Sequence, residues 1–130
     1  MESGIIDIRE LTKFYGRSRG IEKINLQVNK GDIFGFIGPN GAGKSTTIRI
    51  LLNLIFPDRG KAEILGMDVV KHSKKIKTYI GYIPSEANLY DKMGVKEFLI
   101  YCSRFYNIRN VEKRIRELSS LFELLRNCKM

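Results

Sequence analysis

The spacing of apolar positions along the first two thirds of the chain predicts a series of short strands. Residues 5–8 and 24–28 alternate apolar and polar side chains with a period of about two, which is typical of strands with one buried face. Residues 33–37, Ile-Phe-Gly-Phe-Ile, form a continuous apolar run, which favours a strand covered on both faces. Residues 62–65 and 79–84 predict two further strands, the second ended by its proline.

Three other stretches carry the three- and four-residue spacing of helices. One helical pattern starts at Lys44 and runs to about Ile55, where Pro57 and the Asp-Arg-Gly turn after it stop the helix. Two later stripes, between residues 95 and 106 and between residues 111 and 125, each space apolar side chains for one helical face. Residues 13–20 are rich in Gly, Arg and Ser and predict a loop.

One motif joins the predicted strand at residues 33–37 to the predicted helix at Lys44. Its sequence fits G-x-x-x-x-G-K-[ST], the pattern of a phosphate-binding P-loop. A strand before this loop and a helix after it are the context that the motif requires. We therefore predict a nucleotide-binding site formed by Gly38, Pro39, Asn40, Gly41, Ala42, Gly43, Lys44, Ser45 and Thr46.

The residue types in this motif suit the phosphates of a nucleotide. Glycines allow backbone angles that let successive N–H groups point at one anion, and the helix that follows aims its positive dipole end at the same place. Lys44 is expected to place a cation against the β- and γ-phosphates. The Ser45 hydroxyl offers a hard oxygen ligand for Mg²⁺, and Thr46 offers a donor to the α-phosphate.

Residues 38–47, Gly-Pro-Asn-Gly-Ala-Gly-Lys-Ser-Thr-Thr, resemble the P-loop of the ATP-binding subunits of ABC transporters. Residues 11–16 are similar to the A-loop of that family, which implies that Tyr15 stacks on adenine; the alternative is a plain loop aromatic. Residues 57–66 are similar to the strand segment after the P-loop helix. Residues 80–84, with Leu-Tyr at 89–90 and the segment 95–99, look like the entry to the Q-loop and the helical subdomain.

The resemblance implies an α/β fold with a P-loop NTPase core, led by an antiparallel β segment and ending in part of a helical subdomain. It places the nucleotide-binding core at about residues 1–90 and the start of the helical subdomain at about 91–130, all within one incomplete ATP-binding domain. It also implies ATP and Mg²⁺ as cofactors, a membrane permease and a second ATP-binding subunit as partners, and a cytoplasmic position at the inner face of the membrane.

The chain departs from the family pattern at two places. Ser85 stands where the family usually has the glutamine of the Q-loop, and Glu86 follows it. Glu86 is a candidate for the Mg²⁺ or water site, with a simple loop acid as the alternative. The signature loop, the Walker B strand and the switch histidine of the family have no match before Met130, so we expect a truncated chain that is catalytically incomplete alone.

Composition and charge leave other functions open, but they favour none of them over membership in the ATP-binding family. The chain has 130 residues, which suits one domain, and a net charge of +9 that is densest in residues 71–77. This charge invites a nucleic-acid reading, but no aromatic side chains are interleaved with it, so no nucleic-acid partner is expected. Two cysteines form no metal or redox pattern, the single His72 is expected at the surface, and no apolar run reaches membrane length. The alternatives are a soluble non-transport ATPase, a basic nucleic-acid-binding module and a non-functional remnant.

Overall fold

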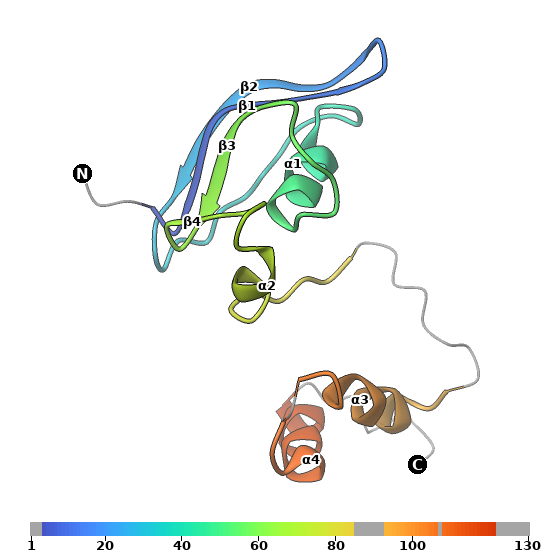
Figure 1. Cartoon of the computed structure of the whole chain (residues 1–130). Helices are drawn as coiled ribbons and strands as arrows, with labels where there is room; N and C mark the ends of the chain where they lie inside the picture. The colour runs from blue at the N-terminus through green and yellow to red at the C-terminus, as the bar shows by residue number, and fades with distance from the viewer. Residues whose placement is uncertain (1–3, 85–92, 107, 122–130) are drawn as a thin grey trace. The chain divides into compact units, whose positions relative to one another are not determined.

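A computed structural model describes residues 4–84, 93–106 and 108–121 of the chain. The chain divides into two compact units, Met1–Tyr82 and Ile83–Met130. The first unit holds a sheet, the helix α1 and a short helix α2, and the second holds α3 and α4 (Figure 1). The predicted functional loop lies wholly within the first unit.

A long antiparallel hairpin forms the largest part of the sheet. Its strands are β1, Ile6–Tyr15, and β2, Ser18–Val28, and their register runs from the pair Ile6 and Val28 to the pair Tyr15 and Ser18. The loop predicted for residues 13–20 is therefore wrong, because only Gly16 and Arg17 turn the chain. Gly16 has a φ of +60°, the left-handed backbone that a two-residue hairpin turn requires.

Two further strands complete the sheet on the other side of β1. The strand β3, Arg59–Ile64, pairs antiparallel with β1, and the short β4, Met67–Asp68, pairs with β3, so the order is β2-β1-β3-β4. The predicted strand at 62–65 is confirmed in its centre, although β3 starts earlier, inside the predicted turn. Gly60 permits this, because it has a φ of +82° and its Cα lies against the Glu10 carbonyl, where a side chain would collide.

The helix α1, Lys44–Leu51, lies against this sheet and begins where the sequence predicts. It ends four residues earlier than predicted. The chain leaves the helix through Asn53, whose φ of +50° is left-handed, and the Asn53 N–H closes the turn on the Ile50 carbonyl at 2.8 Å. The signal for this end was the asparagine, which tolerates left-handed backbone, and not the later proline.

The core of the first unit lies between the sheet and its helices. Burying each branched aliphatic side chain contributes roughly 1.5–3 kcal/mol, so this cluster is what holds α1 and the loop before it in place. The main buried members come from β1, β2, α1, β3, the segment after β4 and α2, and they are Ile8, Leu11, Ile21, Ile50, Ala62, Ile64, Val69 and Ile76.

Two predicted strands are absent from the described residues. Residues 33–37 and 79–84 take no strand hydrogen bonds, and Ile33 and Ile37 are 104% and 92% exposed. A strand exists only when a neighbouring strand pairs with it, and the order β2-β1-β3-β4 leaves neither segment a partner. Residues 33–37 are thus apolar in sequence, but no strand pairs with them among the described residues, and the side chains of Ile33 and Ile37 stay exposed.

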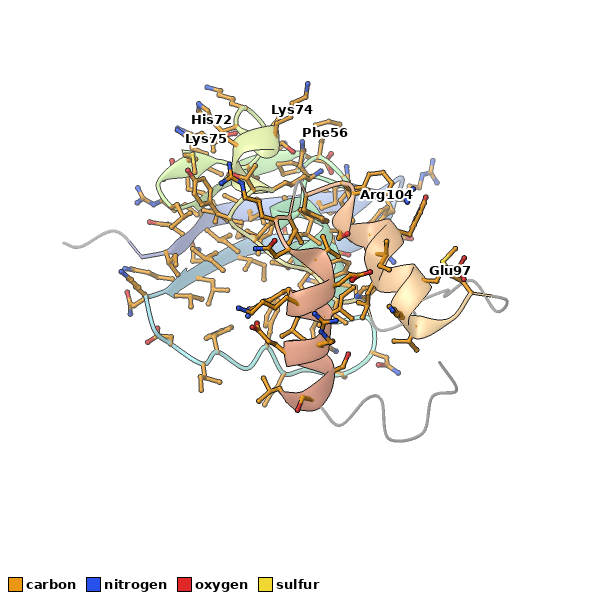
Figure 2. The ribbon with its side chains drawn as sticks, turned by 90° about the horizontal axis from the view of Figure 1, so that it is seen from below. Phe56, His72, Lys74, Lys75, Glu97 and Arg104 are labelled. Atoms are coloured by element: carbon orange, nitrogen blue, oxygen red, sulfur yellow. The ribbon has the colours of Figure 1, made fainter. Side chains whose placement is uncertain are left out.

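The remaining helices are α2, Ser73–Ile76, in the first unit, and α3, Val95–Ser103, and α4, Val111–Leu121, in the second. Both helices of the second unit start where the apolar stripes predict; the part of the last stripe beyond residue 121 lies outside the described residues. The basic stretch 71–77 was not expected to be helical. His72 is exposed as predicted, and it projects to the surface with Lys74 and Lys75 (Figure 2).

Candidate functional site

The loop between residue 37 and α1 has the backbone of an anion cradle. Gly41 and Gly43 have φ of +83° and +88°, and the Ala42 N–H donates to the Pro39 carbonyl at 3.2 Å. A Cβ at Gly43 would collide with the side chain of Ile21 on β2, so only glycine fits there. The loop is therefore held directly against the hairpin, and its conformation depends on that contact.

The first turn of α1 faces the same space. Thr47 anchors the turn, because its backbone N–H and its hydroxyl both donate to the Gly43 carbonyl, at 2.9 and 3.0 Å. The first N–H groups of any α-helix have no acceptor within the helix, and they carry the positive end of its dipole. No acidic side chain lies in this turn, so nothing in it competes with an incoming anion.

Lys44 folds back over the loop. Its Nζ donates to the Gly38 carbonyl at 2.5 Å and to the Pro39 carbonyl at 2.8 Å. These two bonds place the ammonium beside the cradle while a third donor direction stays available. Gly38 and Pro39, which the motif predicted as binding residues, therefore act in this structure as acceptors that position Lys44.

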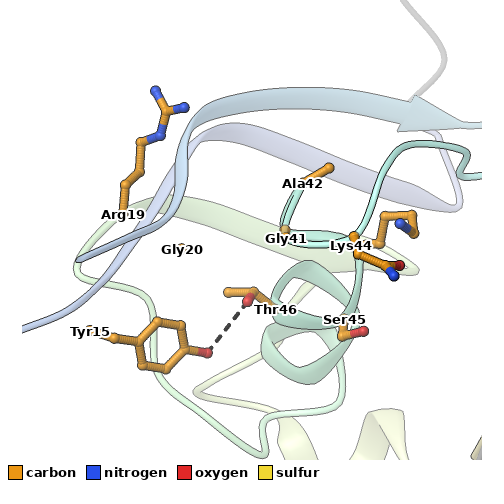
Figure 3. Close-up of a pocket in the computed structure, with 10 residues that line it drawn as sticks. Tyr15, Arg19, Gly20, Gly41, Ala42, Lys44, Ser45 and Thr46 are labelled. Carbon is orange, nitrogen blue, oxygen red and sulfur yellow. Dashed lines mark hydrogen bonds between the residues drawn. The ribbon is translucent and has the colours of Figure 1, made fainter.

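Tyr15 ends β1 beside the loop. Its hydroxyl lies 3.4 Å from the Thr46 hydroxyl, and its side chain is partly exposed (Figure 3). The strand end is fixed by Asp58, which accepts from the Phe14 N–H at 2.7 Å and from the Lys13 Nζ at 2.9 Å. The hydrogen bond from the Phe14 backbone, followed by that from Lys13, lowers the pKa of Asp58, so this carboxylate stays charged at neutral pH.

These parts enclose one cavity of about 340 Å³ between the hairpin and the start of α1. Two of the residues around it, Arg19 and Gly20, were missed by the sequence reasoning, because the predicted loop at 13–20 hid the strand that carries them. The glycine that follows Tyr15 is the sequence signal that could have indicated a hairpin turn and a second strand carrying these two residues. The residues that line the cavity are Tyr15, Arg19, Gly20, Asn40, Gly41, Ala42, Gly43, Lys44, Ser45 and Thr46.

The charges around the cavity suit an anion. Arg19 and Lys44 are the two charged side chains in its lining, and no carboxylate lines it among the described residues. The hydroxyls of Ser45 and Thr46 face it from α1, so the donor set fits a phosphate chain, with a hard oxygen for Mg²⁺. Glu86, the other predicted candidate, lies outside the described residues, as does Ser85.

No group of three or more metal-ligating side chains forms a site within residues 4–84, 93–106 and 108–121. Among the described residues that line the cavity, Ser45 is the one that the motif predicts as a metal ligand, and the bound ligand's own oxygens would add to it. This is the usual arrangement for Mg²⁺, which keeps several of its own ligands and takes few from protein.

The glycine cradle, the helix that follows it and the adjoining sheet define an α/β protein of the P-loop class. Residues 21–128 match the family described as ABC transporter, and the chain belongs to that family. In the part of the chain that the structure describes, none of the helices has the length and apolar character needed to cross a membrane.

Two bacterial relatives support the same assignment. The chain is 37% identical over 122 residues to the probable multidrug ABC transporter ATP-binding protein YbhF of Escherichia coli (strain K12), which covers 92% of this chain and 21% of YbhF. It is 42% identical over 106 residues to the bacitracin transport ATP-binding protein BcrA of Bacillus licheniformis, covering 82% of this chain and 35% of BcrA.

Solved structures share the fold. An ATP-binding subunit of an ABC transporter superposes with a TM-score of 0.80 at 29% identity, over 94% of this chain and 52% of that one. An ABC transporter ATP-binding protein from Pyrococcus furiosus superposes with a TM-score of 0.77 at 26% identity, over 95% and 60%. The fold is thus that of an ABC ATPase domain, and the chain spans about half of these structures and less of the two named relatives.

Proposed function

We propose that the cavity binds Mg-ATP and that the chain is the nucleotide-binding part of an ABC transporter, in which ATP hydrolysis by the complete protein drives transport. One observation carries the proposal: a single cavity joins an aromatic ring, Tyr15, to a cationic glycine cradle that begins α1. That combination suits a ligand with a flat base at one end and phosphates at the other.

Each predicted residue then has a role that its position supports. The backbone of residues 41–46, at the start of α1, surrounds the phosphates, and the Lys44 ammonium, held beside the loop by the Gly38 and Pro39 carbonyls, contacts them. Ser45 is the residue that would hold Mg²⁺, whose charge would offset that of the phosphates. Tyr15 offers its ring to adenine. In this proposal, about residues 1–90 act as the nucleotide-binding core and about residues 91–130 as the start of the helical subdomain.

The partners follow from the same proposal. Relatives bear the names of transport ATP-binding proteins, so the chain is proposed to work with a membrane permease and with a second ATP-binding subunit, at the cytoplasmic face of the membrane. Glu86, which follows Ser85 at the Q-loop position, is proposed as a carboxylate that approaches the bound Mg²⁺ or a water, with a simple loop acid as the alternative.

Calorimetry of the chain with Mg-ATP tests the proposal. Lys44→Ala removes a charge-assisted contact to phosphate, so affinity should fall by ~2 kcal/mol or more, which is about thirtyfold. A matched control is Lys30→Ala, which removes one exposed lysine of the same unit from outside the cavity lining. Equal affinity of the parent and Lys44→Ala would contradict the P-loop assignment.

A further inference from the structure

Arg19 is the charged cavity residue that the P-loop motif does not account for. It lies on β2 opposite Phe14 of β1, one residue past the pair Tyr15 and Ser18. It lines the same cavity as Tyr15 and the loop, and its side chain is 71% exposed. The hairpin therefore contributes a cationic residue as well as an aromatic one to the cavity lining, and Figure 3 shows their side chains extending in different directions.

Gly20 follows Arg19 on β2 and contacts the ring of Tyr15, whereas the Arg19 guanidinium points away from that ring (Figure 3). A Cβ at Gly20 would lie 2.8 and 3.1 Å from two ring carbons of Tyr15, so the ring rests against this glycine. Arg19 is its neighbour in sequence. A ligand that stacks on the Tyr15 ring and extends toward the loop consequently passes the wall of the cavity to which Arg19 belongs.

The two cations of the cavity differ in how they are engaged. Lys44 is held by two backbone carbonyls of its own loop. Arg19 has one weak ion pair, from its Nη1 to the Glu22 Oε2 at 3.5 Å, three residues along the strand, and both side chains are exposed. Exposed pairs of this kind contribute very little stability, so exchanging Glu22 for a phosphate costs Arg19 almost nothing.

We propose that Arg19 is a second cationic contact for the triphosphate chain of the bound nucleotide, released from Glu22 when the nucleotide enters. The inference rests on the proposed Mg-ATP site and extends it to the hairpin. A guanidinium offers paired N–H donors in a planar fork that matches two phosphate oxygens, and it stays charged at every physiological pH. Glu22 thereby acts as a competitor that weakens binding.

Calorimetry of the full 130-residue chain with Mg-ATP tests the contact. Arg19→Gln should weaken binding about three- to tenfold, because a partly exposed charge-assisted contact is lost. The matched control is Arg17→Gln, which removes the same charge from the turn of the same hairpin, outside the cavity lining. It should change affinity less than about twofold, since distant exposed charges are screened by salt.

Glu22→Gln gives a prediction of opposite sign. Freeing Arg19 from its competitor should strengthen binding about twofold, an effect that should vanish in the double variant Arg19→Gln/Glu22→Gln. Arg19→Lys keeps the charge and loses the fork, so it should recover part of the affinity. Far-UV circular dichroism of each variant should match that of the parent, which separates lost contacts from lost folding.

Inorganic tripolyphosphate with Mg²⁺ identifies the group that Arg19 contacts. The loss caused by Arg19→Gln should persist with this ligand, which has no base or ribose. If Arg19→Gln loses affinity for Mg-ATP but not for tripolyphosphate, Arg19 does not contact phosphate and the assignment is wrong. If Arg19→Gln and Arg17→Gln lose affinity equally, the effect comes from net charge and not from a specific contact, which also contradicts the assignment. If Lys44→Ala loses affinity and Arg19→Gln does not, the inference fails while the proposed function stands; if Lys44→Ala binds as the parent does, the proposed function itself fails.

Discussion

Tyr15 brings two groups to the cavity, an aromatic ring and a hydroxyl. The hydroxyl reaches the Thr46 hydroxyl only at 3.4 Å and in an exposed position, which makes this a weak hydrogen bond. The ring rests on Gly20 and lines the cavity. The ring is therefore the part of Tyr15 that should matter for binding adenine.

Tyr15→Ala should lower Mg-ATP affinity by about 0.5–1.5 kcal/mol beyond the lost contact area, the usual contribution of an aromatic stack. Tyr15→Phe should bind nearly as the parent does, because it keeps the ring. Titration calorimetry measures both. If Tyr15→Phe is as harmful as Tyr15→Ala, the hydroxyl is the working group and the stacking role is wrong.

Asp68 ties the end of β4 to the chain that follows. Its Oδ1 accepts the N–H groups of Val70 and Lys71, both at 2.9 Å. The hydrogen bond from the Lys71 N–H lowers the pKa of Asp68 most, and the bond from the Val70 N–H lowers it further. Together they outweigh burial, which raises the pKa, so the pKa of Asp68 lies below its usual value. A carboxylate whose pKa is lowered by folding adds stability above its unfolded pKa and loses it as pH falls through its folded pKa.

We expect Asp68 to contribute fully at neutral pH and to lose its contribution only below about pH 4, where an unfolded aspartate takes up its proton. Asp68→Asn keeps a carbonyl acceptor without the charge, so its stability should depend less on pH in that acid range. Urea unfolding of both proteins at several pH values measures this. Parallel pH profiles would show that the carboxylate is not the group that titrates.

The segment 33–37 and the helix α1 lie in the same unit, but their apolar side chains differ in burial. Ile50 of α1 is fully buried in the core between sheet and helix, whereas Ile33 is 104% exposed. Both are isoleucines in stretches whose apolar residues predict burial, one as a strand and the other as a helix. Only contacts with residues far away in the chain separate them, since burial requires a partner surface.

Ile50→Ala should destabilise the first unit by about 2–5 kcal/mol, because it leaves a cavity in the core. Ile33→Ala should change the free energy of unfolding by less than about 0.5 kcal/mol, because the side chain contacts mainly solvent. Urea unfolding followed by far-UV circular dichroism compares the two. A comparable loss in both variants would mean that residues 33–37 are covered in solution.

At the scale of the molecule, the described residues form a cavity lined by a glycine loop, Arg19 and Lys44, without a carboxylate in its lining. Phosphoryl transfer in P-loop enzymes depends on groups that orient the attacking water and hold the metal. No carboxylate lines the cavity among the described residues, and Ser45 is the only Mg²⁺ ligand that the motif predicts there. We therefore expect binding and turnover to be separable in this chain.

We expect the 130-residue chain to bind Mg-ATP and to release phosphate no faster than Lys44→Ala does. Positioning and charge stabilisation supply most of the rate in such reactions, so a cradle alone gives little turnover. A phosphate-release assay on the purified chain measures it. Sustained release that depends on Lys44 would show that the chain is catalytically competent, and Glu86→Gln would then be the first variant to make.

Much of the site could be predicted because its determinants are local. The glycines, Lys44, Ser45 and the start of α1 occupy a short stretch, and the backbone angles that make the cradle belong to those residues themselves. The starts of α1, α3 and α4 are predicted equally well, since amphipathic spacing needs no knowledge of the rest of the chain. Tyr15 was predicted by family resemblance rather than by local physics.

The remaining features depend on residues that are distant in sequence. The length of the hairpin, the places of Arg19 and Gly20 at the cavity, and the contact of Gly43 with Ile21 arise only when β1 and β2 pair and dock on the loop. The apolar residues 33–37 likewise favour burial, but their sequence does not indicate which strand pairs with this segment. Sequence thus determined the chemistry of the loop, and tertiary packing decided which side chains share its cavity, because hydrogen-bonded pairing and burial are properties of two surfaces and not of one segment.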